Sequence, residues 1–147
     1  MNLHSKEYKL RFSKNYLYRQ KVWKIITTFM QQFIPKNSTV LDLGAGWCEF
    51  INNIDAKNKI ALDLNPDIFK MANRDITVTQ QSSTIEWNIN KPKIDVIFTS
   101  NFLEHLKNRD DIEKTLFYAH KNLKPNGLMI LIGPNIKYTH GSYWDFW

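Results

Sequence analysis

The chain has 147 residues, which is enough for one domain with a buried core and too few for two. Its 43% hydrophobic content excludes a disordered chain, and its single cysteine, Cys48, excludes an internal disulfide and favours a reducing compartment. No apolar run approaches the length of a membrane span, and the N-terminus lacks the apolar stretch of a secretory signal, so we expect a cytoplasmic protein.

The net charge of +6 is concentrated at the N-terminus. Residues 1–24 hold seven basic side chains and one acidic side chain, whereas residues 25–147 carry thirteen of each sign. Aromatic residues are interleaved with the basic ones, which is also the pattern of a surface that binds nucleic acid. A solvated helix face with aromatic anchors is the simpler interpretation, and nucleic-acid binding is kept as an alternative.

Residues 1–34 are predicted to form a basic segment that leads into an amphipathic helix. Apolar residues between Tyr16 and Phe33 recur three and four positions apart, which is the spacing of one helix face. Pro35 ends this helix because its ring cannot continue the hydrogen-bond pattern.

The segment 39–50 organises the rest of the sequence. Residues 40–43 are an apolar run typical of a strand buried on both faces; the run breaks at Gly44 and Gly46, and apolar residues then resume at helical spacing. We therefore expect a strand, a tight glycine turn and a helix. Two glycines in such a turn let a ligand lie against bare backbone, with amide groups pointing at it.

The residues around the glycines narrow the class of ligand. A dinucleotide-binding turn has a third glycine where this chain has Glu49, and a phosphate-binding P-loop has a Gly-Lys-Ser/Thr sequence that is absent here. Asp42 stands in front of the glycines, and a carboxylate suits a cationic ligand better than a pyrophosphate. A glycine turn without any ligand is the other interpretation.

The pattern Asp42-x-Gly44-x-Gly46 resembles the first motif of class I S-adenosylmethionine-dependent methyltransferases, whose cofactor carries a sulfonium and an ammonium. Cys48 stands where that family usually has a third glycine. The resemblance implies that the acid orders the amino-acid end of the cofactor. It also implies backbone contacts to the cofactor from Leu43, Gly44, Ala45 and Gly46.

A second buried strand is predicted at the start of segment 60–66. Asp63 lies at its end, seventeen residues beyond Gly46, and an acid at this place in an open α/β sheet can bind ribose hydroxyls with both oxygens. The methyltransferase family uses an acid in this way, and we assign Leu64 to the same cofactor contact. An acid here can also cap the short helix that Pro66 opens, and the two roles are compatible.

A third, weaker strand is predicted over 76–79, and a polar loop follows it. Related enzymes place an acid or a small polar residue in this loop, where it bonds the adenine amino group. This loop contains no acid, so the resemblance leaves Ser82 or Ser83 as the substitute, unless the backbone fills the role.

A fourth strand over 94–98 runs into segment 99–106, which resembles the fourth methyltransferase motif. That resemblance implies that Asn101 and Phe102 line the methyl-donor end of the cofactor. His105 is a candidate general base, and a structural histidine beside the pocket is the other interpretation. The remaining histidines have no partners at ligand spacing, so no metal site is predicted.

A helix over 109–123, a turn at 124–127 and a fifth strand over 128–132 complete the pattern. The alternation predicts one domain of the α/β class, with a Rossmann-like, doubly wound sheet of about five mostly parallel strands and helices on both faces. The resemblance covers residues 38–136. The aromatic tail, 137–147, stands where that family continues into two further strands, so we expect a C-terminally shortened fold.

The resemblance implies a methyltransferase that uses S-adenosylmethionine and acts on a small molecule, a sugar, a lipid precursor or RNA. Tyr16 or Arg19 is expected to fold over the pocket and meet the cofactor carboxylate. An unprotected fifth strand favours a homodimer. Two alternatives stay open, namely a non-catalytic cofactor-binding or partner protein of the same fold, and a nucleic-acid-binding module that uses the basic N-terminus.

Overall fold

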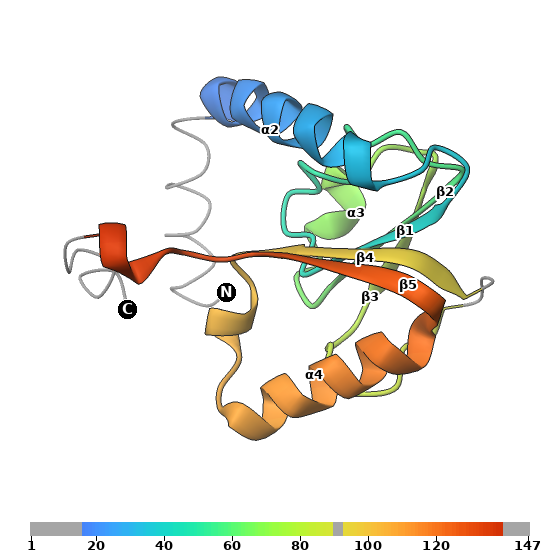
Figure 1. The fold of residues 1–147 in the computed structure, drawn as a ribbon, viewed down its shortest axis with the longest axis vertical. Helices are drawn as coiled ribbons and strands as arrows, with labels where there is room; N and C mark the ends of the chain where they lie inside the picture. The colour runs from blue at the N-terminus through green and yellow to red at the C-terminus, as the bar shows by residue number, and fades with distance from the viewer. Residues whose placement is uncertain (1–15, 90–92, 140–147) are drawn as a thin grey trace.

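A five-stranded sheet forms the centre of the molecule in the computed structural model, which describes residues 16–89 and 93–139 (Figure 1). Its strands run in the order β3-β2-β1-β4-β5, and every neighbouring pair is parallel. Because the strand order reverses between β1 and β4, the predicted doubly wound sheet is confirmed. The strands are β1 Thr39–Leu43, β2 Asn58–Asp63, β3 Ile76–Gln80, β4 Ile94–Ser100 and β5 Leu123–Ile132.

Helices cover both faces of this sheet, as predicted (Figure 1). Helix α2, Tyr16–Met30, continues into the 3-10 turn η1, Gln31–Phe33, and lies on the same face as the short α3, Ile68–Met71. Helix α4, Arg109–Asn122, lies on the opposite face. Successive side chains of a strand point to opposite faces, so each central strand contributes to two separate clusters of buried apolar side chains.

The cluster beneath α2 is built around Phe98 of β4. Its ring stacks on that of Phe50 with the centroids 3.6 Å apart, and it meets the ring of Trp23 edge-on at 6.3 Å. Phe50 and Phe98 are each 1% exposed, so both are fully removed from water. These aromatic contacts fasten α2 to the centre of the sheet.

The helix expected after the glycine turn is absent from the described structure, where residues 44–54 form successive turns instead. The Asn53 amide bonds the carbonyl of Phe50, three residues back, while its side chain donates to the carbonyl of Glu49 at 2.7 Å. The side chain of Asn52 donates to Met71 at 2.8 Å. Two backbone bonds of the segment still span four residues, from Asn52 to Cys48 and from Ile54 to Phe50, but the side-chain bonds compete with the other helical bonds and no helix forms.

The fifth strand begins at Leu123, five residues earlier than predicted. Leu123 pairs with Ile94 and Leu128 pairs with Val96, so the residues between them form an irregularity opposite the single residue Asp95. The Asp95 carboxylate accepts a bond from Lys124 Nζ at 2.6 Å and one from the amide of Thr39 at 2.8 Å. The predicted turn therefore exists as a bulge inside β5, and the Asp95 carboxylate links this bulge to the start of β1.

Among the helices of residues 16–89 and 93–139, none has both the length and the hydropathy of a membrane span.

Phe98→Ala is expected to lower the free energy of unfolding by about 3–5 kcal/mol, because it leaves a cavity between two aromatic rings. Phe117→Ala on α4 removes the same atoms from a side chain that is 62% exposed, so it should cost less than about 1 kcal/mol. Urea denaturation of both variants beside the parent chain measures the difference. Equal losses would contradict this arrangement of the core.

Candidate functional site

The glycine turn lies where the carboxyl ends of β1, β2 and β4 come together. It follows β1 directly, at the point where the strand order reverses, which is the usual ligand edge of an open α/β sheet. Gly44 and Gly46 have φ angles of +70° and +51°, and Cys48 has a φ of +58°. These left-handed conformations turn the chain sharply back over the sheet, and the glycines adopt them without steric cost.

Three consecutive amides of the turn are held by the end of β2. The amides of Gly44 and Ala45 donate to the carbonyl of Leu62 at 2.8 and 3.2 Å. The amide of Gly46 donates to Asp63 Oδ2 at 2.7 Å. The expectation that the amides of this turn point at a ligand is therefore wrong for these three residues, because parallel pairing continues past the last residue of β1.

Phe102 covers the glycine turn from the side of β4. A Cβ atom built on Gly44 would lie 2.3 Å from Cδ2 of Phe102, so only glycine fits beneath this ring. Thr99 adds a second link, since its hydroxyl donates to the carbonyl of Leu43 at 2.7 Å. The structure thus places Phe102 against the turn, and its contact with the cofactor stays a prediction. Thr99 was missed because a threonine in an apolar strand has no distinctive sequence signal.

Asp63 uses both carboxylate oxygens to hold backbone amides. Oδ2 accepts from Gly46, and Oδ1 accepts from Asn65 at 2.7 Å. A carboxylate oxygen has two acceptor positions, so each oxygen keeps one for a ligand. The side chain of Leu64, beside it, is 69% exposed at the same edge of the sheet. The anchoring role and the predicted ribose role are therefore compatible.

Asp42 lies buried beneath the turn, with 4% of its surface exposed. Its pKa is raised to about 8, mainly by burial and then by the charge of Asp63, with a smaller contribution from Glu49. A hydrogen bond from the backbone of Ile51 acts in the opposite direction and lowers this pKa. Burial likewise raises the pKa of the Cys48 thiol to about 12, with Asp42 adding to the effect. Acidic groups are therefore crowded under the glycine turn, and burial together with this crowding keeps the proton on Asp42 up to about pH 8.

Arg19 of α2 pairs with Glu49 in a two-pronged ion pair. Its Nε donates to Oε1 at 2.8 Å and its Nη2 donates to Oε2. The Glu49 side chain is 5% exposed and that of Arg19 is 30% exposed. The sequence offered Tyr16 or Arg19 for a cofactor carboxylate, and the structure commits two of the donors of Arg19 to Glu49. No sequence signal connects two residues thirty positions apart.

The two serines after β3 have different roles. The Ser82 hydroxyl bonds the Thr84 hydroxyl at 2.8 Å, which closes a local turn. The Ser83 hydroxyl is buried and bonds the Thr115 hydroxyl of α4 at 2.8 Å. Trp87 Nε1 donates to the carbonyl of Ser83 at 3.0 Å. Ser83 therefore fastens this loop to α4, which leaves Ser82 as the nearer match to the predicted adenine contact.

Asn101 directly follows β4 with a φ of +47°, and its amide donates to the carbonyl of Ile132 at 2.9 Å. Its side chain donates to the Ser100 hydroxyl at 3.1 Å. His105 ends the 3-10 turn η2, Leu103–His105, and its ring is exposed on the segment after β4. The side chain of Tyr16 and the residues 1–15 and 140–147 lie outside the described residues.

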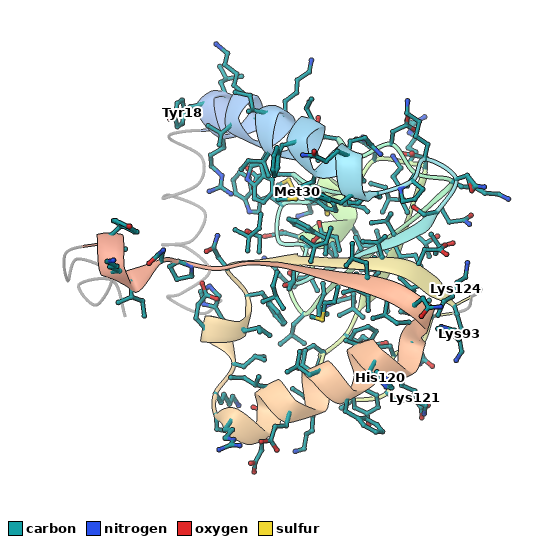
Figure 2. The ribbon with its side chains drawn as sticks, viewed as in Figure 1. Tyr18, Met30, Lys93, His120, Lys121 and Lys124 are labelled. Atoms are coloured by element: carbon teal, nitrogen blue, oxygen red, sulfur yellow. The ribbon has the colours of Figure 1, made fainter. Side chains whose placement is uncertain are left out.

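A hollow of about 530 Å³ lies at the other edge of the sheet, where β4 and β5 begin, among four of the residues labelled in Figure 2. Two of its lysines carry partners, since Lys121 lies 2.5 Å from Glu86 and Lys124 lies 2.6 Å from Asp95. Because ligands of open α/β sheets bind at the carboxyl ends of strands, the glycine turn is the better candidate site. The basic residues of the hollow are Lys93, His120, Lys121 and Lys124.

Arg19→Met is expected to destabilise the chain by about 2–4 kcal/mol, because it leaves the buried Glu49 carboxylate without its partner. The double variant Arg19→Met/Glu49→Leu should recover most of this loss, since no unpaired charge is left buried. Urea denaturation of the two single variants and the double variant completes the cycle. Strictly additive losses would show that the pair has no coupling.

Asp42→Asn is expected to remove a pH dependence of stability. The folded chain holds the Asp42 proton up to about pH 8, whereas the unfolded chain, with the ordinary pKa of 3.8, already loses this proton at a lower pH. The free energy of unfolding therefore falls as pH rises between these values, by at most about 1.4 kcal/mol per pH unit. Denaturation at about pH 5 and about pH 8 should show the fall in the parent chain and a smaller one in Asp42→Asn.

Comparison with known proteins agrees with this geometry. The family model described as a methyltransferase domain matches residues 16–147. No curated protein matches the chain by sequence. The fold is similar to that of several proteins of known structure, each less than 25% identical, so the likeness to them concerns the fold alone.

A TehB-like SAM-dependent methyltransferase from Corynebacterium glutamicum gives a TM-score of 0.70 at 18% identity, covering 87% of this chain and 71% of that one. DesVI from Streptomyces venezuelae gives a TM-score of 0.61 at 16% identity, and the match covers 89% of this chain and 57% of that one. The N-methyltransferase NodS from Bradyrhizobium japonicum gives a TM-score of 0.64 at 14% identity, and the match covers 77% of this chain and 67% of that one. NodS is also known in complex with S-adenosyl-L-homocysteine. With its family match and its five-stranded parallel sheet, the chain belongs to the methyltransferase domain family and has the Rossmann-like fold of the class I enzymes.

Proposed function

We propose that the protein binds S-adenosylmethionine at the glycine turn and transfers its methyl group to a small-molecule acceptor. The observation that carries the proposal is the imbalance of charge at the turn. The carboxylates of Glu49 and Asp63 lie there against one cation among the described residues, Arg19, and the buried carboxyl of Asp42, which keeps its proton up to about pH 8, can ionise beside a further cation. A cationic ligand would complete the balance, and S-adenosylmethionine carries a sulfonium and an ammonium.

The same residues argue against a dinucleotide. A pyrophosphate is bound by free backbone amides and is repelled by carboxylates beneath the glycine turn. Here the amides of Gly44, Ala45 and Gly46 are already bonded to β2, and acids surround the turn. The occupied amides and the missing third glycine therefore both favour a cationic cofactor over a dinucleotide.

The chain's own residues would bind and orient the cofactor. The remaining acceptor positions of Asp63 fit ribose hydroxyls, and Leu64 offers apolar surface beside them. Phe102 and Asn101 stand at the end of β4, where the acceptor would approach. When bound, the cofactor supplies an electrophilic methyl group, so the protein's part is alignment and exclusion of water.

His105 stays our candidate for the group that takes a proton from the acceptor, because it follows β4 at the carboxyl edge of the sheet. A cytoplasmic location fits the single cysteine, which is buried and unpaired.

Calorimetric titration with S-adenosylmethionine and S-adenosylhomocysteine tests the cofactor. We expect dissociation constants in the micromolar range for the parent chain, and binding at least about tenfold weaker for Asp63→Ala, because charge-assisted hydrogen bonds are lost. Asp75→Ala is the matched control, since this acid precedes β3 at the opposite edge of the sheet and pairs with Lys59. Circular dichroism checks that each variant is folded.

Two results would overturn the proposed function. A folded parent chain that binds neither compound would remove the cofactor. Binding of a nicotinamide dinucleotide with higher affinity than S-adenosylmethionine would show that the charge argument selects the wrong ligand.

A further inference from the structure

Helix α2 carries an apolar face that points away from the sheet. Tyr18, Ile25 and Phe29 of α2 and Phe33 of η1 are 69%, 72%, 58% and 50% exposed. We call these four residues the outer stripe. The first three lie seven and four positions apart, which places them on one side of the helix, and the Phe33 ring meets that of Phe29 edge-on at 5.7 Å. Four large apolar side chains in one row are unusual on a free surface.

The outer stripe is additional to the face that α2 buries. On the buried side, Trp23 packs against Phe98, Thr27 is 3% exposed, and Met30 packs against the cluster beneath the helix. Figure 2 shows Met30 between α2 and the sheet and Tyr18 at the outer surface of the first turns. The helix is therefore apolar on two opposite sides, and its contact with the sheet accounts for one of them.

The charged residues of α2 itself are all positive. Lys21 is three residues after Tyr18 and four before Ile25, so it lies on the same face, and Lys24 lies on the flank. The sequence of residues 16–33 contains no acidic residue. Helix α4 differs, because its exposed Phe117 lies in a helix that also carries acids, two of them in its first turn.

We propose that the outer stripe of α2 docks on an anionic lipid surface, with the helix lying in the plane of the interface. A helix with an exposed row of aromatic and aliphatic side chains and lysines beside it is suited to the boundary between headgroups and acyl chains. The row from Tyr18 to Phe29 runs for about 17 Å along the helix. The lysine stems can lie along the apolar row while their ammonium groups reach lipid phosphates.

Two other occupants fit this surface less well. Nucleic acid is bound by stacking bases on aromatic rings, and Ile25 at the centre of the row has no π face. A second copy joined through the same face by a twofold axis would bring two basic helices together, and neither helix has an acidic residue to pair with the lysines of the other. The combination of aliphatic centre and basic flank therefore selects lipid.

Co-sedimentation of the full chain with vesicles tests the proposal without any cofactor, so its outcome is independent of the proposed function. The vesicles are phosphatidylcholine alone and phosphatidylcholine with about one quarter phosphatidylglycerol, each at about 0.05 M and about 0.5 M salt. We expect binding to the anionic vesicles that weakens at least about fivefold at high salt, and little binding to phosphatidylcholine alone.

Ile25→Ser/Phe29→Ser should weaken binding to the anionic vesicles at least about tenfold. The matched control is Leu116→Ser/Phe117→Ser on α4, which removes two exposed apolar side chains elsewhere and should leave binding unchanged. Lys21→Glu/Lys24→Glu should remove the salt-dependent part of the binding to anionic vesicles. All of these side chains point to solvent, so circular dichroism and the melting temperature should stay close to those of the parent chain.

Three results would overturn the proposal. The first is equal binding by the parent chain and Ile25→Ser/Phe29→Ser, which would assign any lipid affinity to other residues. The second is a dimer in light scattering that this double variant dissociates, which would make a second copy the occupant. The third is salt-dependent RNA binding that the variant loses while vesicle binding is absent.

Discussion

The backbone bonds from the glycine turn to the end of β2 hold the candidate site together. The amides of Gly44 and Ala45 reach the carbonyl of Leu62, and the amide of Gly46 reaches Asp63. Because β1 and β2 pair in register up to Leu43 and Leu62, the turn starts from a fixed position. The place of Asp63, the left-handed glycines and the ring of Phe102 all depend on this extension of the sheet.

Helix α2 is part of the site, because it supplies the cation that pairs with a buried acid beside the turn. Glu49 is nearly inaccessible and needs the guanidinium of Arg19, which comes from a helix that also packs on the sheet through Trp23. A change in how α2 lies on the sheet would therefore alter the charge beneath the turn, and with it the balance that favours a cationic ligand. The lipid-facing side of the same helix gives such a change a physical origin.

Most of the fold could be predicted because it depends on local patterns. The apolar run before Gly44 predicted β1, and helical spacing from Tyr16 to Phe33 predicted α2. The helix after the turn was wrong because Asn52 and Asn53 bond distant or local carbonyls, which apolar spacing does not reveal. Pairings across thirty or more positions, such as Arg19 with Glu49, follow from the packed structure and have no periodic signal.

The close packing of Phe102 on Gly44 has an evolutionary consequence. A side chain at position 44 would have to displace the ring, and the φ of +70° would still cost about 1–2 kcal/mol for a residue other than glycine. Positions 44 and 102 are therefore coupled, although they lie 58 positions apart in the chain. A lineage could lose the glycine only after replacing the phenylalanine with a smaller residue, so substitutions at these two positions should occur in that order.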